Sequence, residues 1–148
     1  YNWTSQPWKT QYWQREIMNK MYKNNIDGLC GNDDCGQMSA WYILSEFGFY
    51  PVCPGTDQYV LGAPYLPFIK INLENGNTLT IKAEGISDKN RYVKRVKLNG
   101  QPYTKGFITI DDILKGGELT FEMSSKPNKK RIFSGDDRPY SMTEKVKK

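Results

Sequence analysis

The sequence predicts an α+β chain in which two helices are followed by an antiparallel, sandwich-like set of strands. Three observations support this prediction. Apolar residues recur at helical spacing before residue 48, and short segments alternate between apolar and polar residues after about residue 58. Asn-Gly pairs, which favour tight hairpin turns, separate two pairs of those segments. With 148 residues, the chain is long enough for one hydrophobic core and too short for two independent ones.

The first helix is expected over residues 8–24, a stretch without Gly or Pro. Pro7 precedes it, at a place where proline suits the first helical turn. Its predicted buried stripe repeats every fourth residue through Trp13, Ile17 and Met21, with Tyr12 and Met18 beside it.

The second helix is expected over residues 37–47, because Asn and Gly residues between 24 and 36 interrupt the helical pattern. Gly48 is placed to end it, and Pro51 prevents it from resuming. The first 57 residues hold eleven of the twenty aromatic side chains. Two helices cannot bury so many rings against each other, so we expect them to belong to a larger helical body.

The alternating segments predict the strands, which are expected at residues 68–73, 78–83, 92–98, 107–110 and 118–123. Hairpin turns are predicted at 74–77 and at Asn99-Gly100, and a single capped helical turn at 111–114. After Ser124 the chain is rich in Lys, Pro and Ser, and we expect it to be extended or frayed.

Composition excludes several classes of function. The chain has no histidine, which removes imidazole metal sites and nucleophiles activated by histidine. The net charge is +5, divided as −2 over residues 1–57 and +7 over 58–148, and the cations are dispersed rather than concentrated as a nucleic-acid interface requires. The longest apolar run has five residues, far below the ~20 of a membrane span.

Three cysteines are present, so at least one is unpaired within this chain. Cys30 and Cys35 could close a small loop and leave Cys53 over, or all three could be free thiols. The spacing contains no CxxC pair, and no histidine can complete a zinc site.

The segment Gly28–Gln37 concentrates chemistry, since it sets Asn32, Asp33 and Asp34 between glycines directly before the second helix. The structural interpretation is that Asp33 or Asp34 caps that helix while the glycines only make turns. The functional interpretation is that the glycines bring the backbone close to a ligand. A carboxylate at a helix N-terminus stays ionised, which suits a general base or a ligand for a hard cation such as calcium.

The run GLCGNDDCGQMSAWYILSEFGFYPVCPGTDQYVLGAP, Gly28 to Pro64, resembles the C-terminal region of bacterial glycoside hydrolase family 92, the calcium-dependent α-mannosidases. The segments Gln6–Gln11, Leu98–Thr104 and Gly116–Leu119 agree, so that the resemblance covers residues 1 to about 128. It implies that residues 1–56 are the last helices of an (α/α)6 barrel, that 57–125 form a β region and that 126–148 are an extended basic tail.

The resemblance also implies the roles of the loop residues. Asp34 matches the family's general base, and Asn32 matches a residue that assists the attacking water, although some members have a carboxylate there. Asp33 completes the candidate catalytic set. Asp34 is also the expected contact to calcium, while the general acid and most calcium ligands are expected upstream of this chain. The fragment alone is therefore expected to be inactive.

The implied activity is inverting exo-hydrolysis of α-mannosides, with α-1,2 linkages in N-glycans or mannan as the expected substrate. The expected partners are mannose-containing glycans and the upstream part of the same polypeptide, with no nucleic acid and no membrane span. The expected location is periplasmic, secreted or on the cell surface.

Two alternatives remain open at this stage. One is a non-catalytic carbohydrate-binding module with exposed rings as stacking platforms, for which the candidates are Tyr59, Tyr65, Phe68, Tyr92 and Tyr103. The other is a purely structural β-sandwich domain.

Overall fold

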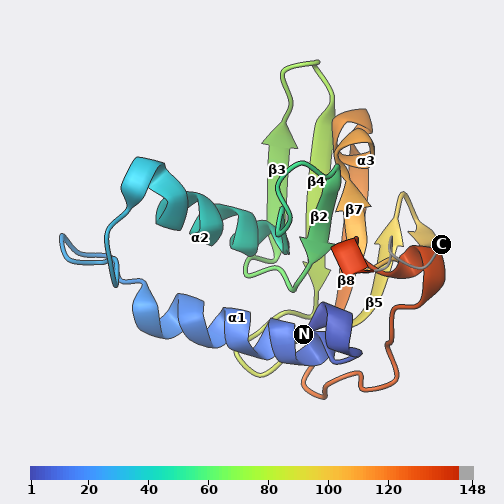
Figure 1. Ribbon diagram of the computed structural model, residues 1–148, viewed down its shortest axis with the longest axis horizontal. Coiled ribbons are helices and arrows are strands. Elements are labelled where there is room, and N and C mark those ends of the chain that lie inside the picture. The colour runs from blue at the N-terminus through green and yellow to red at the C-terminus, as the bar shows by residue number, and fades with distance from the viewer. Residues whose placement is uncertain (144–148) are drawn as a thin grey trace.

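A computed structural model describes residues 1–143 and confirms the α+β class. Two helices, α1 (Pro7–Met21) and α2 (Gln37–Phe47), extend to one side of two sheets and are joined at their far ends by a long loop (Figure 1). No helix within the described residues is both long enough and apolar enough to cross a bilayer.

The second helix has the predicted bounds, and the first ends three residues earlier than predicted. Pro7 begins α1, as expected. The chain leaves α1 at Tyr22, which is already extended with φ −121°. Gly48 ends α2, and its N–H donates to the carbonyls of Leu44 and Ser45.

The predicted buried stripe of α1 is confirmed at Met18 and wrong at Trp13 and Met21. Trp13 and Met21 are each 49% exposed, whereas Gln11 and Arg15 are buried. The side chain of Gln11 accepts a hydrogen bond from Val93 N at 3.0 Å. Arg15 Nη2 donates to the carbonyl of Pro64 at 3.1 Å. The polar face of the helix is therefore bonded to a strand at Val93 and to a loop at Pro64, because this face meets backbone groups that need hydrogen-bond partners.

The apolar stripe of α1 instead borders a groove between the two helices. The groove has a volume of about 300 Å³, and its lining includes Trp13, Ile17, Trp41, Tyr50 and Val52. Its lining brings together the rings of Trp13, Trp41 and Tyr50.

The strands form two sheets. Their bounds are β1 Phe49–Tyr50, β2 Gln58–Leu61, β3 Phe68–Asn72, β4 Thr78–Glu84, β5 Tyr92–Leu98, β6 Gln101–Pro102, β7 Phe107–Thr109 and β8 Gly117–Ser124. One sheet has the order β1-β2-β7 and the other the order β3-β4-β8-β5-β6. The helical turn predicted at 111–114 is the short helix α3, Ile110–Lys115.

The expectation that all strands pair antiparallel is wrong at one position. Strands β4 and β8 are parallel, with Leu79 opposite Gly117 and Glu84 opposite Glu122. Parallel pairing needs a long crossover, and residues 85–116, which include β7 in the other sheet and α3, provide it. The two predicted hairpins are present, joining β3 to β4 and β5 to β6.

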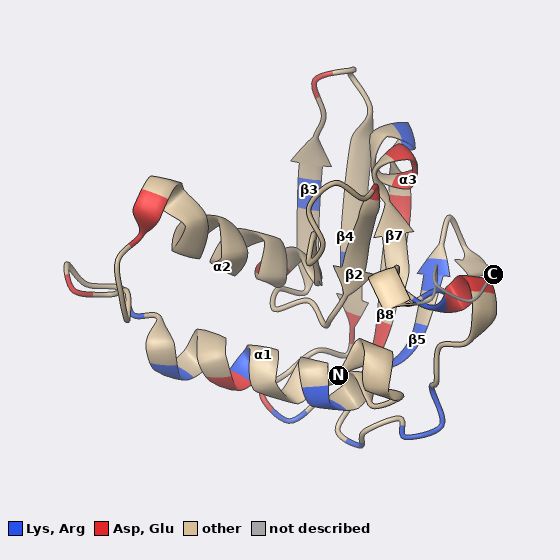
Figure 2. Cartoon of the chain, viewed as in Figure 1, with Lys and Arg blue, Asp and Glu red and all other residues tan. Residues whose placement is uncertain are grey.

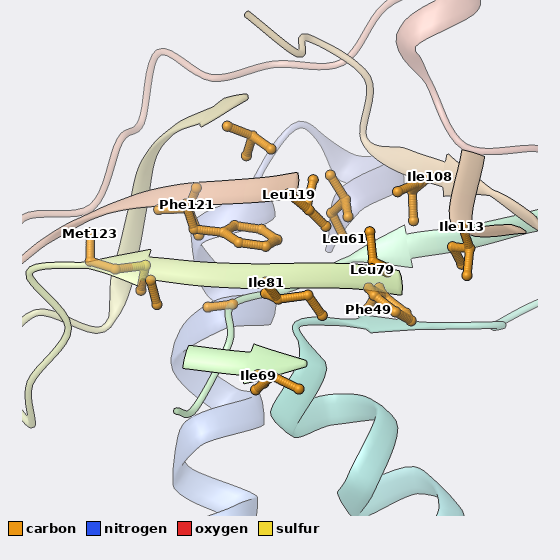
Figure 3. Packing of buried hydrophobic residues seen from close by; sticks show 14 residues of the cluster. Phe49, Leu61, Ile69, Leu79, Ile81, Ile108, Ile113, Leu119, Phe121 and Met123 are labelled. Carbon is orange, nitrogen blue, oxygen red and sulfur yellow. The ribbon is translucent and has the colours of Figure 1, made fainter. Parts of the chain in front are cut away.

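One hydrophobic core lies between the sheets and is shared by them (Figure 3). Leu79, Ile81, Leu119 and Phe121 of the larger sheet are fully buried, as is Ile108 of the smaller one. Burial alternates residue by residue along β4, so one face of that strand supplies the core. The two sheets are thus packed face to face, as in a sandwich.

The segment after β8, predicted to be extended or frayed, is irregular over residues 126–143 and is anchored to the rest of the chain. Phe133 is buried, and its ring lies where a Cβ at Gly106 would be, which only glycine allows. Trp3 Nε1 donates to the carbonyl of Tyr140 at 2.9 Å, and Arg138 Nη2 donates to the carbonyl of Trp3 at 2.9 Å. Residues 144–148 of the predicted tail lie outside the described part of the chain.

Candidate active site

The candidate site is the loop that joins the far ends of α1 and α2 (Figure 1). Its base is closed by an isolated antiparallel bridge between Tyr22 and Leu29 and by the hydrogen bond from Lys23 N to Gly28 O at 2.8 Å. A Cβ at Gly28 would lie 2.0 Å from the carbonyl oxygen of Lys23. Only glycine therefore permits this closure.

Tyr22 fixes the end of α1 to the beginning of α2. Its ring stacks on Trp41 with centroids 5.7 Å apart and lies 4.8 Å from the ring of Tyr42. Its hydroxyl donates to the carbonyl of Met38 at 3.1 Å, and burial raises the pKa of this hydroxyl. The helical pattern gave no signal for this residue, because it follows the last turn of α1 and its partners belong to another element.

Asp33 caps α2 with both oxygens of its carboxylate. Oδ1 accepts the backbone N–H groups of Met38 at 2.7 Å and Ser39 at 3.2 Å, and Oδ2 accepts the hydroxyl of Ser39 at 2.6 Å. The Ser39 hydroxyl foremost, and then the two amides, hold the pKa of Asp33 below its ordinary value. Ser39 was not predicted to be part of the site.

Gly36 directly precedes α2, and the capping residue, Asp33, lies three positions before Gly36. Cys35 and Gly36 both have left-handed φ, 54° and 75°, and Gly36 N donates to Asp33 O at 3.1 Å. This tight turn brings the Asp33 carboxylate over the free amides of the first helical turn.

Asp34 and Asn32 are both exposed beside this cap. Within residues 1–143, neither side chain takes part in a hydrogen bond or an ion pair. The prediction that one of the two adjacent carboxylates caps the helix is confirmed for Asp33. The carboxylate of Asp34 is left available to solvent or to a ligand, and the loop holds all three candidate residues within one turn.

The described residues contain no group of three His, Cys, Asp or Glu side chains able to hold a metal ion. Cys30, Cys35 and Cys53 are free thiols, so the loop is not closed by a disulfide. Carboxylate and amide oxygens are the donors that calcium prefers, and Asp34 and Asn32 supply donors of that kind. The loop therefore fits calcium in the type of its donors and not in their number.

A cavity of about 380 Å³ lies beside the loop, between the end of α1 and the beginning of α2. Its lining includes Tyr22, Lys23, Asn24, Leu29, Ser39 and Tyr42. Ser39 lines the cavity and also donates a hydrogen bond to Asp33, so it connects the cavity with the site. Aromatic and amide side chains around such a volume are typical of a small-ligand pocket.

The rings considered for sugar stacking do not form a shared platform. Only Phe68 is exposed, at 56%, and it lies on the edge strand β3. Tyr65 is covered by the Arg15 guanidinium at 4.3 Å and donates to Asn19 at 2.9 Å. No feature of these rings favours a carbohydrate-binding module over a site at the loop.

Comparison with known proteins points to one family. The model of the glycosyl hydrolase family 92 catalytic domain matches residues 1–125. An uncharacterized secreted glycosidase of Arthroderma benhamiae is 29% identical over 108 residues, which cover 71% of this chain and 14% of that protein.

Two solved structures from Bacteroides thetaiotaomicron are closely similar. A family 92 α-mannosidase in complex with mannoimidazole has a TM-score of 0.91 and 46% identity, covering 96% of this chain and 19% of that one. An inverting mannosidase of the same family, from strain VPI-5482, has a TM-score of 0.89 and 40% identity, covering 97% and 19%. The chain thus spans about a fifth of the length of these solved relatives, and it belongs to glycoside hydrolase family 92.

Proposed function

We propose that this chain provides the general-base loop of an inverting, calcium-dependent exo-α-mannosidase that releases α-1,2-linked mannose from N-glycans or mannan. The observation that supports this proposal is the difference between two adjacent carboxylates. Asp33 is committed to α2 through three hydrogen bonds, whereas Asp34 is exposed and has no partner within residues 1–143. The names of the relatives, an α-mannosidase and an inverting mannosidase, support the reaction and the substrate class.

In this proposal the Asp34 carboxylate accepts a proton from the water that attacks the anomeric carbon, on the face opposite the leaving oxygen. The amide of Asn32 orients that water. Asp33 is a positioning residue, because its bonds to Met38 and Ser39 fix the loop on α2. Inversion needs an acid about 6.5–9.5 Å from the base, and we place that acid in the upstream part of the polypeptide.

Calcium is part of the proposal, with Asp34 as its contact in this chain. When bound, the ion would engage sugar hydroxyls and favour distortion of the sugar ring. The remaining oxygen ligands would come from the upstream polypeptide, since the described residues hold no cluster sufficient for a metal. The proposed location, periplasmic, secreted or at the cell surface, is supported by a relative named as a secreted glycosidase.

The test uses the full-length polypeptide that carries this chain. Asp34→Asn should lower kcat by about 10²–10⁴-fold, the usual contribution of a general base, and leave the fold intact. Asp33→Asn is the matched control, one residue away, and should retain most of kcat while lowering thermal stability. Ser39→Ala should resemble Asp33→Asn, since it removes a hydrogen bond to the same carboxylate. Equal loss of kcat in the Asp33 and Asp34 variants would contradict the assignment.

A further inference from the structure

A basic cleft lies at the opposite end of the molecule from the candidate site, between β5 and the segment that follows β8. Its volume is about 450 Å³. Five cations line it: Lys94, Arg95 and Lys97 of β5, and Lys130 and Arg131 of the C-terminal segment. Figure 2 shows the blue of Lys and Arg on β5 and on the chain that runs beside it. The position is far from the loop between α1 and α2 (Figure 1).

Few carboxylates neutralise these cations. Lys94 and Arg95 share one partner, Glu122, with Arg95 Nε 3.8 Å from its Oε2. Asp137 is the one acidic residue in the lining of the cleft. Lys97 and Lys130 form no ion pair within residues 1–143. The cleft therefore keeps an excess of positive charge that is fixed on two facing segments.

The guanidinium of Arg131 is the most unusual group in the cleft. It lies over the buried Phe133 ring, with Cζ 5.3 Å from the ring centroid. Among the described residues, its Nη2 is the only buried side-chain nitrogen or oxygen without a hydrogen-bond partner. Burial lowers the pKa of Arg131 to about 10, although the charge of Asp137 acts to raise it. A buried nitrogen of a cation without a hydrogen-bond partner is costly, and a bound anion would offset that cost.

The neighbouring groups extend the site beyond the charges. Pro102 and Tyr103 contribute apolar surface, and Thr104 and Asn128 contribute a hydroxyl and an amide. The amide nitrogen of Asn128 donates to the carbonyl of Lys94 at 3.1 Å, so it ties the C-terminal segment to β5. A cleft of this volume accommodates a sugar-sized ligand in addition to one anionic group.

We propose that this cleft binds a phosphate or sulfate monoester carried on a sugar. The ester oxygens would be held by Arg131 and by the two unpaired lysines, Lys97 and Lys130, because guanidinium and ammonium groups form charge-assisted hydrogen bonds to such oxyanions. The sugar would lie against Pro102 and Thr104. The site is independent of the function proposed for Asp34, and its failure would leave that proposal unaffected.

The test is calorimetric titration of the chain at low salt with mannose 6-phosphate, glucose 6-sulfate, mannose and inorganic phosphate. Both esters should bind, and each should bind more tightly than mannose or inorganic phosphate. Lys97→Gln and Arg131→Gln should each weaken ester binding about tenfold, the loss expected for one charge-assisted contact. Lys70→Gln, an exposed cation on β3 at the other edge of the sheet, is the matched control and should change it less than about twofold.

Arg131 is partly buried, so its variant is checked by circular dichroism, and exposed Lys97 decides the test if the Arg131 variant does not fold. A second readout is thermal stability: mannose 6-phosphate should raise the midpoint of the parent chain and not that of Arg131→Met. Absence of ester binding, or equal losses in the Lys70 and Lys97 variants, would overturn the site. Inorganic phosphate that binds as tightly as the esters would overturn the role of the sugar.

Discussion

At the scale of single residues, Asp33 links protonation to the structure of the candidate site. Its carboxylate accepts two backbone amides and one hydroxyl, and all three donors belong to the first turn of α2. Those hydrogen bonds are stronger to the ionised carboxylate than to the neutral acid. A protonated Asp33 would weaken the attachment of the loop to the helix, and the loop also carries Asp34.

The pH dependence of stability follows from the lowered pKa of Asp33. Its folded-state pKa lies below the value of 3.8 for a free side chain, so its contribution to stability is complete above about pH 4 and is lost as the pH falls through the folded-state value. The melting temperature of Asp33→Asn should lie about 2–5 °C below that of the parent chain, the effect of a lost helix cap. This difference should be constant from pH 5 to 7 and should shrink below about pH 4. Thermal denaturation at several pH values measures it. A difference that grew in acid would contradict the role of Asp33 as an ionised cap.

The sequence could identify the pair of carboxylates and could not decide which one caps α2. Two adjacent aspartates before a helix are equally good candidates for its cap when the backbone conformation between them and the helix is unknown. The left-handed turn at Cys35 and Gly36 decides in favour of Asp33, and Cys35 is not a residue type that signals such a turn. The contribution of Ser39 depends on the same turn and was not predictable for the same reason.

At the scale of elements, the bounds of helices and strands were more predictable than the segments against which they pack or pair. The bounds of α2 and β5 agree with the prediction, because capping glycines, turn residues and alternation are local signals. Most of the buried face of α1 and the parallel pairing of β4 with β8 were not predicted correctly. Both depend on which segment lies opposite, and that is decided by contacts distant in sequence.

The loop that carries the site depends on Gly28. Gly28→Ala should destabilise the chain by about 1–3 kcal/mol, as overpacking does, because the new Cβ would lie 2.0 Å from the carbonyl oxygen of Lys23. Gly31→Ala is the matched control in the same loop, since a Cβ there would lie 3.8 Å from Met38 Sδ, an ordinary contact. Denaturant unfolding measures both variants. Similar losses of unfolding free energy would show that closure at Gly28 is not the reason for its presence.

The helix α2 should be less protected than the central strands. Ser45 is the one buried residue of α2, whereas β4 and β8 contribute Leu79, Ile81, Leu119 and Phe121, all fully buried. Backbone amides of α2 should therefore exchange with solvent at least about tenfold faster than those of β4 and β8. Hydrogen exchange of a dilute monomer provides the measurement. Equal protection would mean that the helices and the sheets unfold as one unit.

At the scale of the whole molecule, the two helices have the arrangement found in much longer relatives. The TM-score of 0.91 extends over 96% of the chain and so includes both α1 and α2. The groove between them nevertheless exposes Trp13 and Val52, each 49% accessible. An apolar surface of this kind is typical of a face that packs against another part of a protein.

The division of the proposed site between segments predicts the behaviour of the chain alone. The purified 148-residue chain should release no mannose from α-mannosides, with or without calcium, because a positioned acid is needed together with the base. The full-length polypeptide, assayed in parallel with and without a chelator, is the control and should be active only with calcium. Calcium-dependent release of mannose by the chain alone would show that it holds a complete site.

The contacts between the segment around Trp3 and residues 133–140 have a consequence for proteolysis. Ends of proteins commonly fray first and are the first places that proteases cut. Here Trp3 accepts a hydrogen bond from Arg138 and donates one to Tyr140, and the Phe133 ring packs beside Gly106, so the segment around Trp3 and residues 133–140 hold each other in place. Among the described residues, we expect a protease to cut first in the loop between α1 and α2, where Ile26 is 103% exposed. A nick there would interrupt the chain between α1 and α2 and leave the sheets whole, so the first cut would fall in the loop that carries the candidate site.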